Sequence, residues 1–252
     1  MIMRKRPEEL NKMRRAGRVV GEILEILRAA VRPGVTTAEL DEIAEREIRA
    51  RSATPSFKGY RGFPATICTS VNSEIVHGIP GKRTLKEGDL VKLDAGAIVE
   101  GYHGDAAISV PVGEVPQESL KLIETTERSL QAGIAEARAG NRIGDIGAAV
   151  QTMAEGAGFS VVREYVGHGI GRALHEDPPV PNYGHHGKGL PLEPGLVIAI
   201  EPMVNVGSYE TRLLPDGWTV VTADGALSAH FEHTIAITEN GPEVLTSVNG
   251  YA

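Results

Sequence analysis

Five side chains that could bind metal ions recur at the ends or in the middle of strand-like apolar runs. They are Asp94, Asp105, His168, Glu201 and Glu232. Carboxylate oxygens together with an imidazole nitrogen suit divalent cobalt, manganese, iron or zinc. Since four carboxylates exceed what one ion requires, the set predicts two ions with bridging carboxylates, roughly 3.5–4 Å apart. Such a pair can deprotonate a shared water near neutral pH, and that water can attack a polarised carbonyl.

Asp94 and Asp105 give the clearest case, because the segment between them reads as a β-hairpin with turn residues at Glu100-Gly101. With the turn centred between Val99 and Glu100, the two aspartates become cross-strand partners, their Cβ atoms roughly 5 Å apart. Two carboxylates at that distance repel each other, so the pair persists when a proton is shared or a cation lies between them. Further carboxylates aimed at the same point favour the cation.

His168 and His175 are seven residues apart, a spacing that would align them on one face of a continuous helix. Gly169 and Gly171 argue against a helix at this point. We therefore expect His168 at the end of the strand-like run 161–166, with His175 reaching the same cleft from a loop.

Glu201 and Glu232 also lie in strand-like segments. Glu201 closes the apolar run 197–200 and precedes Pro202, which ends regular strand pairing. Period-two alternation puts Glu232 on one face with His230 and Thr234, opposite Phe231, His233 and Ile235. Taken alone, the side chain in each motif is explained as an ordinary polar group that is solvated or hydrogen-bonded within the protein. Together they favour a site, because six of the eight histidines fall in these segments: His77, His103, His168, His175, His230 and His233.

Two halves with the same order of elements are expected to position these residues. Apolar residues at helical spacing predict four helices, at 7–33, 36–51, 120–140 and 146–156. Strand-like runs lie at 65–71, 90–98, 106–112, 159–165, 196–201, 218–222 and 231–238. The sequence therefore predicts an α/β (α+β) fold in one domain, 1–252, with halves of about 7–115 and 116–245 around a buried sheet.

The totals exclude several classes of protein. Cys68 is the only cysteine, so neither an internal disulfide nor a thiolate-rich zinc site is possible, and a cytoplasmic setting is expected. No apolar run of about twenty residues occurs, so we expect a soluble protein without membrane contact. No broad apolar patch requires a partner, so we expect a monomer. A formal net charge of −7 disfavours DNA binding. The basic side chains of the first helix favour a solvated face, with docking to the ribosome as the minority alternative.

Five segments carry motifs of greater specificity. They are Asn72 to Pro80, Leu93-Asp94 with Gly101 to Asp105, Gly167 to Gly171, Ile200 to Met203, and Phe231 to Thr234. In type, order and spacing they resemble the type I methionine aminopeptidases, and the resemblance covers nearly the whole chain. It implies the pita-bread fold, in which two pseudo-symmetric halves share a curved, largely antiparallel sheet flanked by helices.

The resemblance also implies a role for each metal-binding candidate. Asp94 would hold one ion, and His168 and Glu201 would hold the other. Asp105 and Glu232 would bridge both ions, whose identity is cobalt, manganese, iron or zinc.

Two further groups of residues take their roles from the same resemblance. His77 and His175 would contact the scissile amide and stabilise the tetrahedral intermediate, while Glu201 shuttles the proton of the attacking water. A pocket wall for the methionine side chain, whose thioether suits aromatic and sulfur contacts, would comprise Phe57, Tyr60, Phe63, Cys68 and Trp218. The alternative for these aromatics is that they are ordinary core residues.

The chain departs from the family pattern at four positions. Phe57 and Val76 stand where cysteine is frequent, Leu174 stands where an aromatic residue precedes the second histidine, and His230 stands where glutamine is usual. These changes bear on the shape of the pocket and the surroundings of Glu232.

The activity implied is removal of the initiator methionine from nascent chains and peptides when the second residue is small. Two alternatives compete with it. One is a non-catalytic pita-bread module that binds peptides or proteins, although such relatives lose metal ligands. The other is an Xaa-Pro aminopeptidase of the same fold, whose usual large N-terminal domain is missing here.

Overall fold

The computed structural model describes residues 2–248, so residues 1 and 249–252 of the expected domain lie outside the described part. The first half contains α1 (Pro7–Ala30), α2 (Thr37–Ala50), β1 (Thr54–Pro55), a 3-10 turn η1 (Tyr60–Gly62), β2 (Ile67–Val71), β3 (Glu74–Val76), β4 (Leu90–Val99) and β5 (Tyr102–Pro111). Both predicted helices and all three predicted strands of this half are confirmed.

The second half repeats two helices followed by strands. It contains α3 (Gln117–Glu136), α4 (Ile143–Gly156), β6 (Ser160–Val161), β7 (Gly167–Gly169), β8 (Glu176–Val180), β9 (Val197–Ile200), β10 (Met203–Asn205), β11 (Thr211–Leu213), β12 (Val220–Thr222), β13 (Ser228–His230), β14 (Glu232–Thr238) and β15 (Gly241–Val244). The predicted order of elements is confirmed. The expected strand at 159–165 is shorter than predicted, because only Ser160 and Val161 pair with β10.

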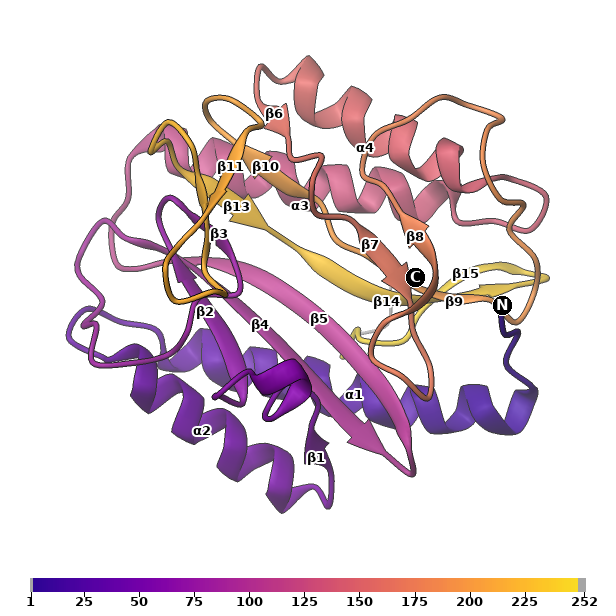
Figure 1. Cartoon of the computed structure of the whole chain (residues 1–252), viewed down its shortest axis with the longest axis horizontal. Helices are drawn as coiled ribbons and strands as arrows, with labels where there is room; N and C mark the ends of the chain where they lie inside the picture. Colours follow the sequence, from indigo (N-terminus) through magenta and orange to yellow (C-terminus); the bar gives the residue numbers. More distant parts are fainter. Residues whose placement is uncertain (1, 249–252) are drawn as a thin grey trace.

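One nine-stranded sheet takes strands from both halves, in the order β1-β4-β5-β14-β9-β7-β8, with β2 on β4 and β15 on β14. The halves meet where β14 pairs with β5, Glu232 lying opposite Ala107 and His233 opposite Ala106. The named strand pairs of this sheet are antiparallel, and the sheet is curved (Figure 1). We therefore propose that the chain forms one domain.

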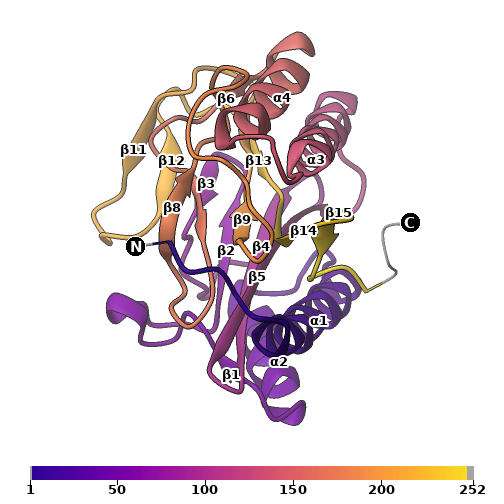
Figure 2. The same cartoon turned by 90° about the vertical axis from the view of Figure 1, so that its right-hand side faces the viewer.

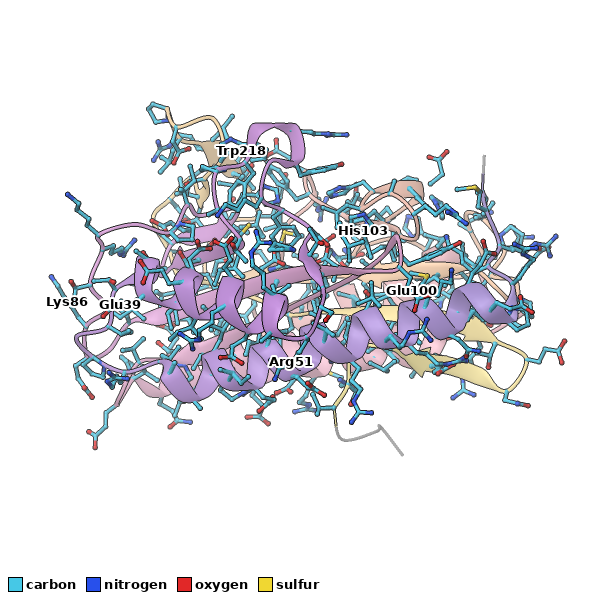
Figure 3. All side chains as sticks on the ribbon, turned by 90° about the horizontal axis from the view of Figure 1, so that it is seen from below. Glu39, Arg51, Lys86, Glu100, His103 and Trp218 are labelled. Atoms are coloured by element: carbon cyan, nitrogen blue, oxygen red, sulfur yellow. The ribbon has the colours of Figure 1, made fainter. Side chains whose placement is uncertain are left out.

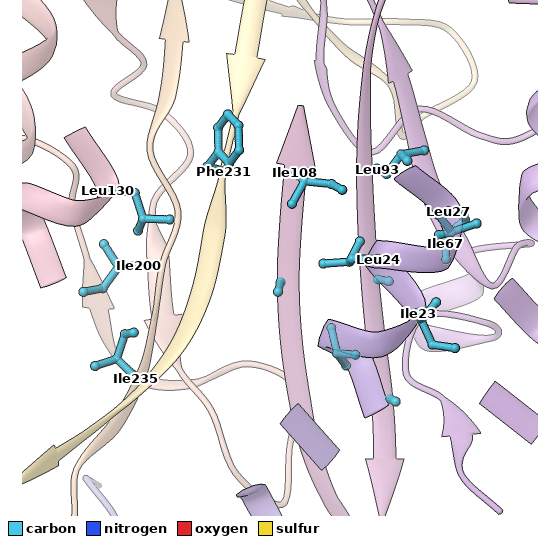
Figure 4. Close-up of a cluster of buried hydrophobic side chains, with 14 of the residues drawn as sticks. Ile23, Leu24, Leu27, Ile67, Leu93, Ile108, Leu130, Ile200, Phe231 and Ile235 are labelled. Atoms are coloured by element: carbon cyan, nitrogen blue, oxygen red, sulfur yellow. The ribbon is translucent and has the colours of Figure 1, made fainter. Parts of the chain in front are cut away.

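All four helices lie on one side of this sheet (Figure 2). From α1, the side chains of Ile23, Leu24 and Leu27 are buried against the strands. Figure 4 shows them in one cluster with Ile108 of β5, while Leu130 of α3 lies with side chains of β9 and β14. Full burial of one such side chain stabilises the fold by about 1.5–3 kcal/mol. Because the helices cover one face, the other face is left for the site.

The N-terminal segment before α1 is tied to the second half by a buried ion pair. The Nζ of Lys5 lies 2.7 Å from the Oε2 of Glu176, and the two side chains are only 4% and 8% exposed. The backbone N–H of Lys5 also donates to the carbonyl of Gly195. Glu176 directly follows His175, so this pair fixes the start of β8 beside a predicted site residue.

Replacing Lys5 with methionine is expected to lower the free energy of unfolding by about 3–5 kcal/mol, because it leaves the buried Glu176 carboxylate without its partner. Urea denaturation of the metal-free protein measures the change. The matched control is the double variant Lys5→Met/Glu176→Gln, which should recover part of the loss because no unpaired charge remains. A single variant as stable as the wild type would contradict this account of the pair.

Candidate metal centre

The register of the β4–β5 hairpin differs from the one predicted. Asp94 lies opposite Ala107, and Asp105 lies opposite Gly96, so the prediction that the two aspartates are direct cross-strand partners is wrong. The two-residue turn is Glu100-Gly101, with φ of 50° and 78°. Two positive φ values define a type I′ turn, whose twist matches the flanking strands. Because the shift is two residues, both carboxylates still point to the same face.

Five adjacent strands each bring one metal-binding candidate to this face. In sheet order, β4 carries Asp94, β5 carries Asp105, β14 begins with Glu232, β9 ends just before Glu201, and β7 carries His168. His168 therefore lies within a short strand of its own rather than at the end of the run 161–166, and this prediction is wrong. His175 lies in the loop before β8, as predicted.

The side chains of these residues converge. The Nε2 of His168 lies 3.6 Å from the Oε1 of Glu201 and 3.9 Å from the Oδ2 of Asp105. Asp105, His168 and Glu232 offer ligand atoms that all lie within 4.8 Å of one another, and Glu201, His230 and Glu232 form a second such group. Four of the five predicted ligands thus lie in these close groups, and Asp94 lines the same cavity beside them.

The tautomer of His168 also suits metal binding. Its Nδ1 lies 2.9 Å from the carbonyl oxygen of Gly169. Since a carbonyl can only accept, Nδ1 carries the proton, and Nε2 keeps its lone pair facing the carboxylates. An imidazole oriented by such a backbone acceptor is the usual arrangement for a metal ligand.

The oxygen atoms leave room for a cation. Within residues 2–248, the Oδ1 atoms of Asp94 and Asp105 and the Oε1 atom of Glu232 are buried without a hydrogen-bond partner. Leaving an ionised carboxylate buried and uncompensated costs several kcal/mol or more, on the order of the desolvation penalty of an ion. Unpaired oxygens and a nitrogen lone pair directed at one point therefore fit divalent metal ions.

Without a cation, the site favours protonated acids and neutral imidazoles. Burial raises the pKa of Asp94 to about 7. Burial, and then the neighbouring carboxylates, raise the pKa values of Asp105, Glu201 and Glu232 well above their usual range. For His168, burial and then His175 lower the pKa to about 3. A metal ion must therefore displace protons from the acids, but none from the imidazole.

All twelve predicted site residues line a single cavity of about 140 Å³. Besides the metal-binding candidates, they are Phe57, Tyr60, Phe63, Cys68, His77, His175 and Trp218. A cavity of this size holds a benzene-sized group. Phe57 and Phe63 also belong to a core cluster with Met13 of α1. These two rings are therefore both core residues and part of the pocket wall, so the two alternatives are compatible. In Figure 3, Trp218 lies on the opposite side of the molecule from α1.

Ring contacts hold the cavity wall together. Phe63 and Trp218 meet edge to face with centroids 5.1 Å apart, and Tyr60 stacks on His175 at 5.3 Å. The hydroxyl of Tyr60 lies 2.9 Å from the Nδ1 of His175, which orients that imidazole. The thiol of Cys68 stays protonated, because burial, and then the charge of Asp94, raise its pKa.

His77 lies in an unusual backbone conformation for a residue other than glycine, with φ of 60°. Strain of this kind is concentrated at functional sites. Burial and then His175 lower the pKa of His77 to about 4, so the ring is neutral at pH 7. It lies edge-on to Tyr165 and Trp218 at the cavity.

Three further residues lie at the site, although the sequence predicts no catalytic or ligand role for them. Arg61 and Leu174 line the cavity, and His230 joins Glu201 and Glu232 in the second group of potential ligands. The alternation that placed His230 on the face of Glu232 was the available signal for His230. Nothing in the sequence separated Arg61 from the neighbouring turn residues.

Comparisons with known proteins agree with this geometry. Residues 11–239 match the model of metallopeptidase family M24. The methionine aminopeptidase 1 of Bacillus subtilis is 56% identical over 248 residues, which cover 98% of this chain and 100% of that protein. The crystal structure of methionine aminopeptidase from Thermotoga maritima superposes with a TM-score of 0.97 at 45% identity, covering 98% of this chain and 100% of that one.

The Xaa-Pro dipeptidase of Bacillus anthracis has a TM-score of 0.79 at 23% identity, and the match covers 98% of this chain but 63% of that one. That likeness establishes the fold alone. The chain belongs to metallopeptidase family M24 and, within it, to the methionine aminopeptidases. The expected pita-bread fold is thereby confirmed, and membership of a metallopeptidase family indicates the use of divalent metal.

Binding of Mn²⁺ to the metal-free protein is expected to release at least about one proton per chain at pH 7, since the ligands must be deprotonated. The apparent affinity should therefore rise as the pH rises through 7, the pKa of Asp94. Calorimetry in buffers of different ionisation enthalpy measures the release. Asp94→Asn, which removes one titrating acid, should release fewer protons. A binding enthalpy that is the same in every buffer would rule out protonated ligands.

Proposed function

We propose that this protein is a metal-dependent aminopeptidase that removes the N-terminal methionine of nascent proteins and peptides when the second residue is small. One observation carries the proposal: a single cavity combines five oxygen and nitrogen ligands with a wall of aromatic and sulfur-bearing side chains. The relatives of about 50% identity named methionine aminopeptidase support it.

Asp94 would hold one divalent ion, His168 and Glu201 would hold the other, and Asp105 and Glu232 would contribute to both. The unpaired oxygens of Asp94, Asp105 and Glu232 support this assignment. Cobalt, manganese, iron or zinc fits such a mixed set of oxygen and nitrogen ligands. When bound, the metal supplies Lewis acidity and a lowered pKa for water.

His77 and His175 act on the amide that is cleaved. Both rings line the cavity, His77 half-buried and His175 exposed. Their pKa values are lowered, so each is neutral at pH 7 and can donate one N–H to the carbonyl oxygen. A donor aimed at developing negative charge stabilises the tetrahedral intermediate. Tyr60 holds His175 through its Nδ1, which leaves Nε2 as the atom that faces the substrate.

Glu201 moves the proton of the reaction. Its carboxyl lies directly after β9, next to His168, and burial raises its pKa well above the usual range. With metal bound, this carboxyl is ionised, and a carboxylate beside the attacking water can accept its proton and return it to the leaving amine.

The methionine side chain lies against Phe57, Tyr60, Phe63, Cys68 and Trp218. A flexible thioether packs well against aromatic rings, which is the reason for assigning this wall to methionine. The small volume of the cavity supports a preference for a free amino terminus followed by a small residue.

Two alternative functions are not favoured. A non-catalytic binding module has no need of a complete set of buried carboxylates, whose burial without metal is costly. The resemblance to the Xaa-Pro dipeptidase is confined to the fold.

The substrates are the N-termini of nascent polypeptides. The enzyme acts on them in the cytoplasm, as a monomer. The sequence indicates a basic surface on α1 that could contact the ribosome. In the structure this surface is smaller, because three of its arginines form ion pairs with glutamates. Arg14 binds Glu243, Arg15 binds Glu100, and Arg18 binds Glu22. No helix within residues 2–248 is both long and apolar enough to cross a lipid bilayer.

Release of free methionine from a Met-Ala-Ser peptide in the presence of Mn²⁺ or Co²⁺ tests the proposal, with an Xaa-Pro peptide as the comparison substrate. Turnover of the first peptide and not the second is the expected result. Failure to cleave the methionine peptide with any of the divalent ions would exclude the function.

Asp105→Asn is expected to lower kcat/KM by at least about 100-fold, since it removes a carboxylate assigned to both ions. Metal content per chain should fall in parallel, measured by elemental analysis after dialysis. Near-normal rates with full metal content would show that Asp105 does not bridge.

His175→Ala is expected to lower kcat by about 10²–10³-fold, because it removes a donor to the developing negative charge. Here the metal content should stay at the wild-type level, which distinguishes this change from Asp105→Asn. Tyr60→Phe serves as the milder companion, since it loses the hydroxyl that orients His175 but keeps the ring. An unaltered kcat in His175→Ala would remove His175 from the chemistry.

A further inference from the structure

We propose that His230 supplies an additional nitrogen ligand to a divalent cation, in a group with Glu201 and Glu232. The inference rests on the proposed metal centre and extends it beyond the five ligands that the family motifs assign. It concerns a residue at which this chain departs from the usual glutamine.

The backbone of His230 is held rigidly. The residue ends β13 and lies opposite Met203 of β10. Its N–H donates to the Oγ of Ser109 at 2.9 Å, and the same hydroxyl donates to the carbonyl of His230 at 2.8 Å. With the main chain fixed to both β5 and β10, the imidazole, only 1% exposed, has little freedom to move away from the site.

The imidazole of His230 has unused bonding capacity. Neither Nδ1 nor Nε2 has a hydrogen-bond partner within the part of the chain that the structure describes. A buried polar group without a partner is rare in a native protein and costs about 1–3 kcal/mol. The nearby Lys92 is engaged elsewhere, since its Nζ donates to the carbonyls of Asn72 and Ser228.

The spacing around Glu201 is that of metal ligands rather than of a hydrogen bond. The Nε2 of His230 lies 3.8 Å from the Oε2 of Glu201, beyond the roughly 2.7–3.2 Å of a hydrogen bond. Two atoms that each lie about 2.0–2.2 Å from one ion are separated by up to roughly 4 Å. His168 shows nearly the same spacing, 3.6 Å, to the other oxygen of Glu201.

Glu201 is therefore flanked by two imidazoles, one facing each of its oxygens. Glu232 completes the group on the side of His230, because ligand atoms of Glu201, His230 and Glu232 all lie within 4.8 Å of one another. The Oε1 of Glu232 is itself buried without a hydrogen-bond partner. One nitrogen and two carboxylate oxygens make a suitable set for a borderline divalent ion.

Two chemical consequences follow. An extra imidazole shifts selectivity from manganese toward cobalt, nickel or zinc, since nitrogen ligands suit these ions. His230 is expected to be the weaker of the two nitrogen ligands, because the Nδ1 of His168 donates to the carbonyl of Gly169 whereas the Nδ1 of His230 has no such acceptor among the described residues.

The first test uses Co²⁺ as the probe and proton NMR as the readout. An imidazole bound to Co²⁺ through Nε2 shows a strongly shifted resonance from its remaining Nδ1–H. The Co²⁺-loaded wild type is expected to show two such resonances, from His168 and His230. His230→Gln should lose one of them, while His168→Gln should lose the other. This count is made on the wild type itself, so it does not depend on the folding of a variant.

The second test compares metal selectivity. Competition between Co²⁺ and Mn²⁺ is followed by elemental analysis, and His230→Gln is expected to lower the preference for Co²⁺ by about 10–100-fold. The matched control is His186→Gln, the same substitution at an imidazole that is exposed and lies outside the cavity. This control should bind both ions as the wild type does.

Each outcome decides one claim. A single resonance in the wild type, or a selectivity unchanged in a folded His230→Gln protein, overturns the role of His230 and leaves the proposed function intact. The absence of any shifted imidazole resonance overturns the metal ligation by His168 as well, and with it the metal centre on which the proposed function depends.

Discussion

Buried negative charge is the constraint on which the rest of this structure depends. Four carboxylates and one imidazole meet in a cavity, and three carboxylate oxygens there have no hydrogen-bond partner among residues 2–248. A protein interior tolerates such a group when protons or cations offset the charge. The surrounding fold must therefore hold the acids together against their repulsion, and the curved sheet does so through strands that cannot separate without losing their ladders of backbone hydrogen bonds.

The way the sheet is assembled explains why two halves are needed. Asp94 and Asp105 come from a hairpin of the first half, whereas His168, Glu201 and Glu232 come from strands of the second. The pairing of β5 with β14 brings the two sets side by side. The helices of both halves cover the outer face, so the inner face is free for chemistry and for the aromatic wall (Figure 2).

Much of this arrangement could be predicted from local chemistry. The predicted helix at 36–51 begins at a capping box, in which the N–H of Glu39 donates to the Thr36 hydroxyl and the Glu39 carboxylate accepts from the Thr36 N–H. The hairpin register was missed by two residues, because the turn type depends on Glu100 adopting a positive φ that its residue type does not favour. Short strands such as β7 and β8 were missed because a few residues pair only through tertiary contacts, and β8 even contains Pro178 and Pro179. The position of His230 near Glu201 depends on β13, and no local sequence pattern predicts that strand.

The anchoring of the N-terminal segment has a consequence for how the protein is handled. Residues 3–5 run beside the strand that follows His175 rather than trailing away from the body of the molecule. A recombinant fusion joined at this end is therefore attached next to a wall of the cavity, and trimming by a contaminating protease as far as Pro7 would remove the ammonium group that neutralises Glu176. Purification tags are better placed at the other terminus.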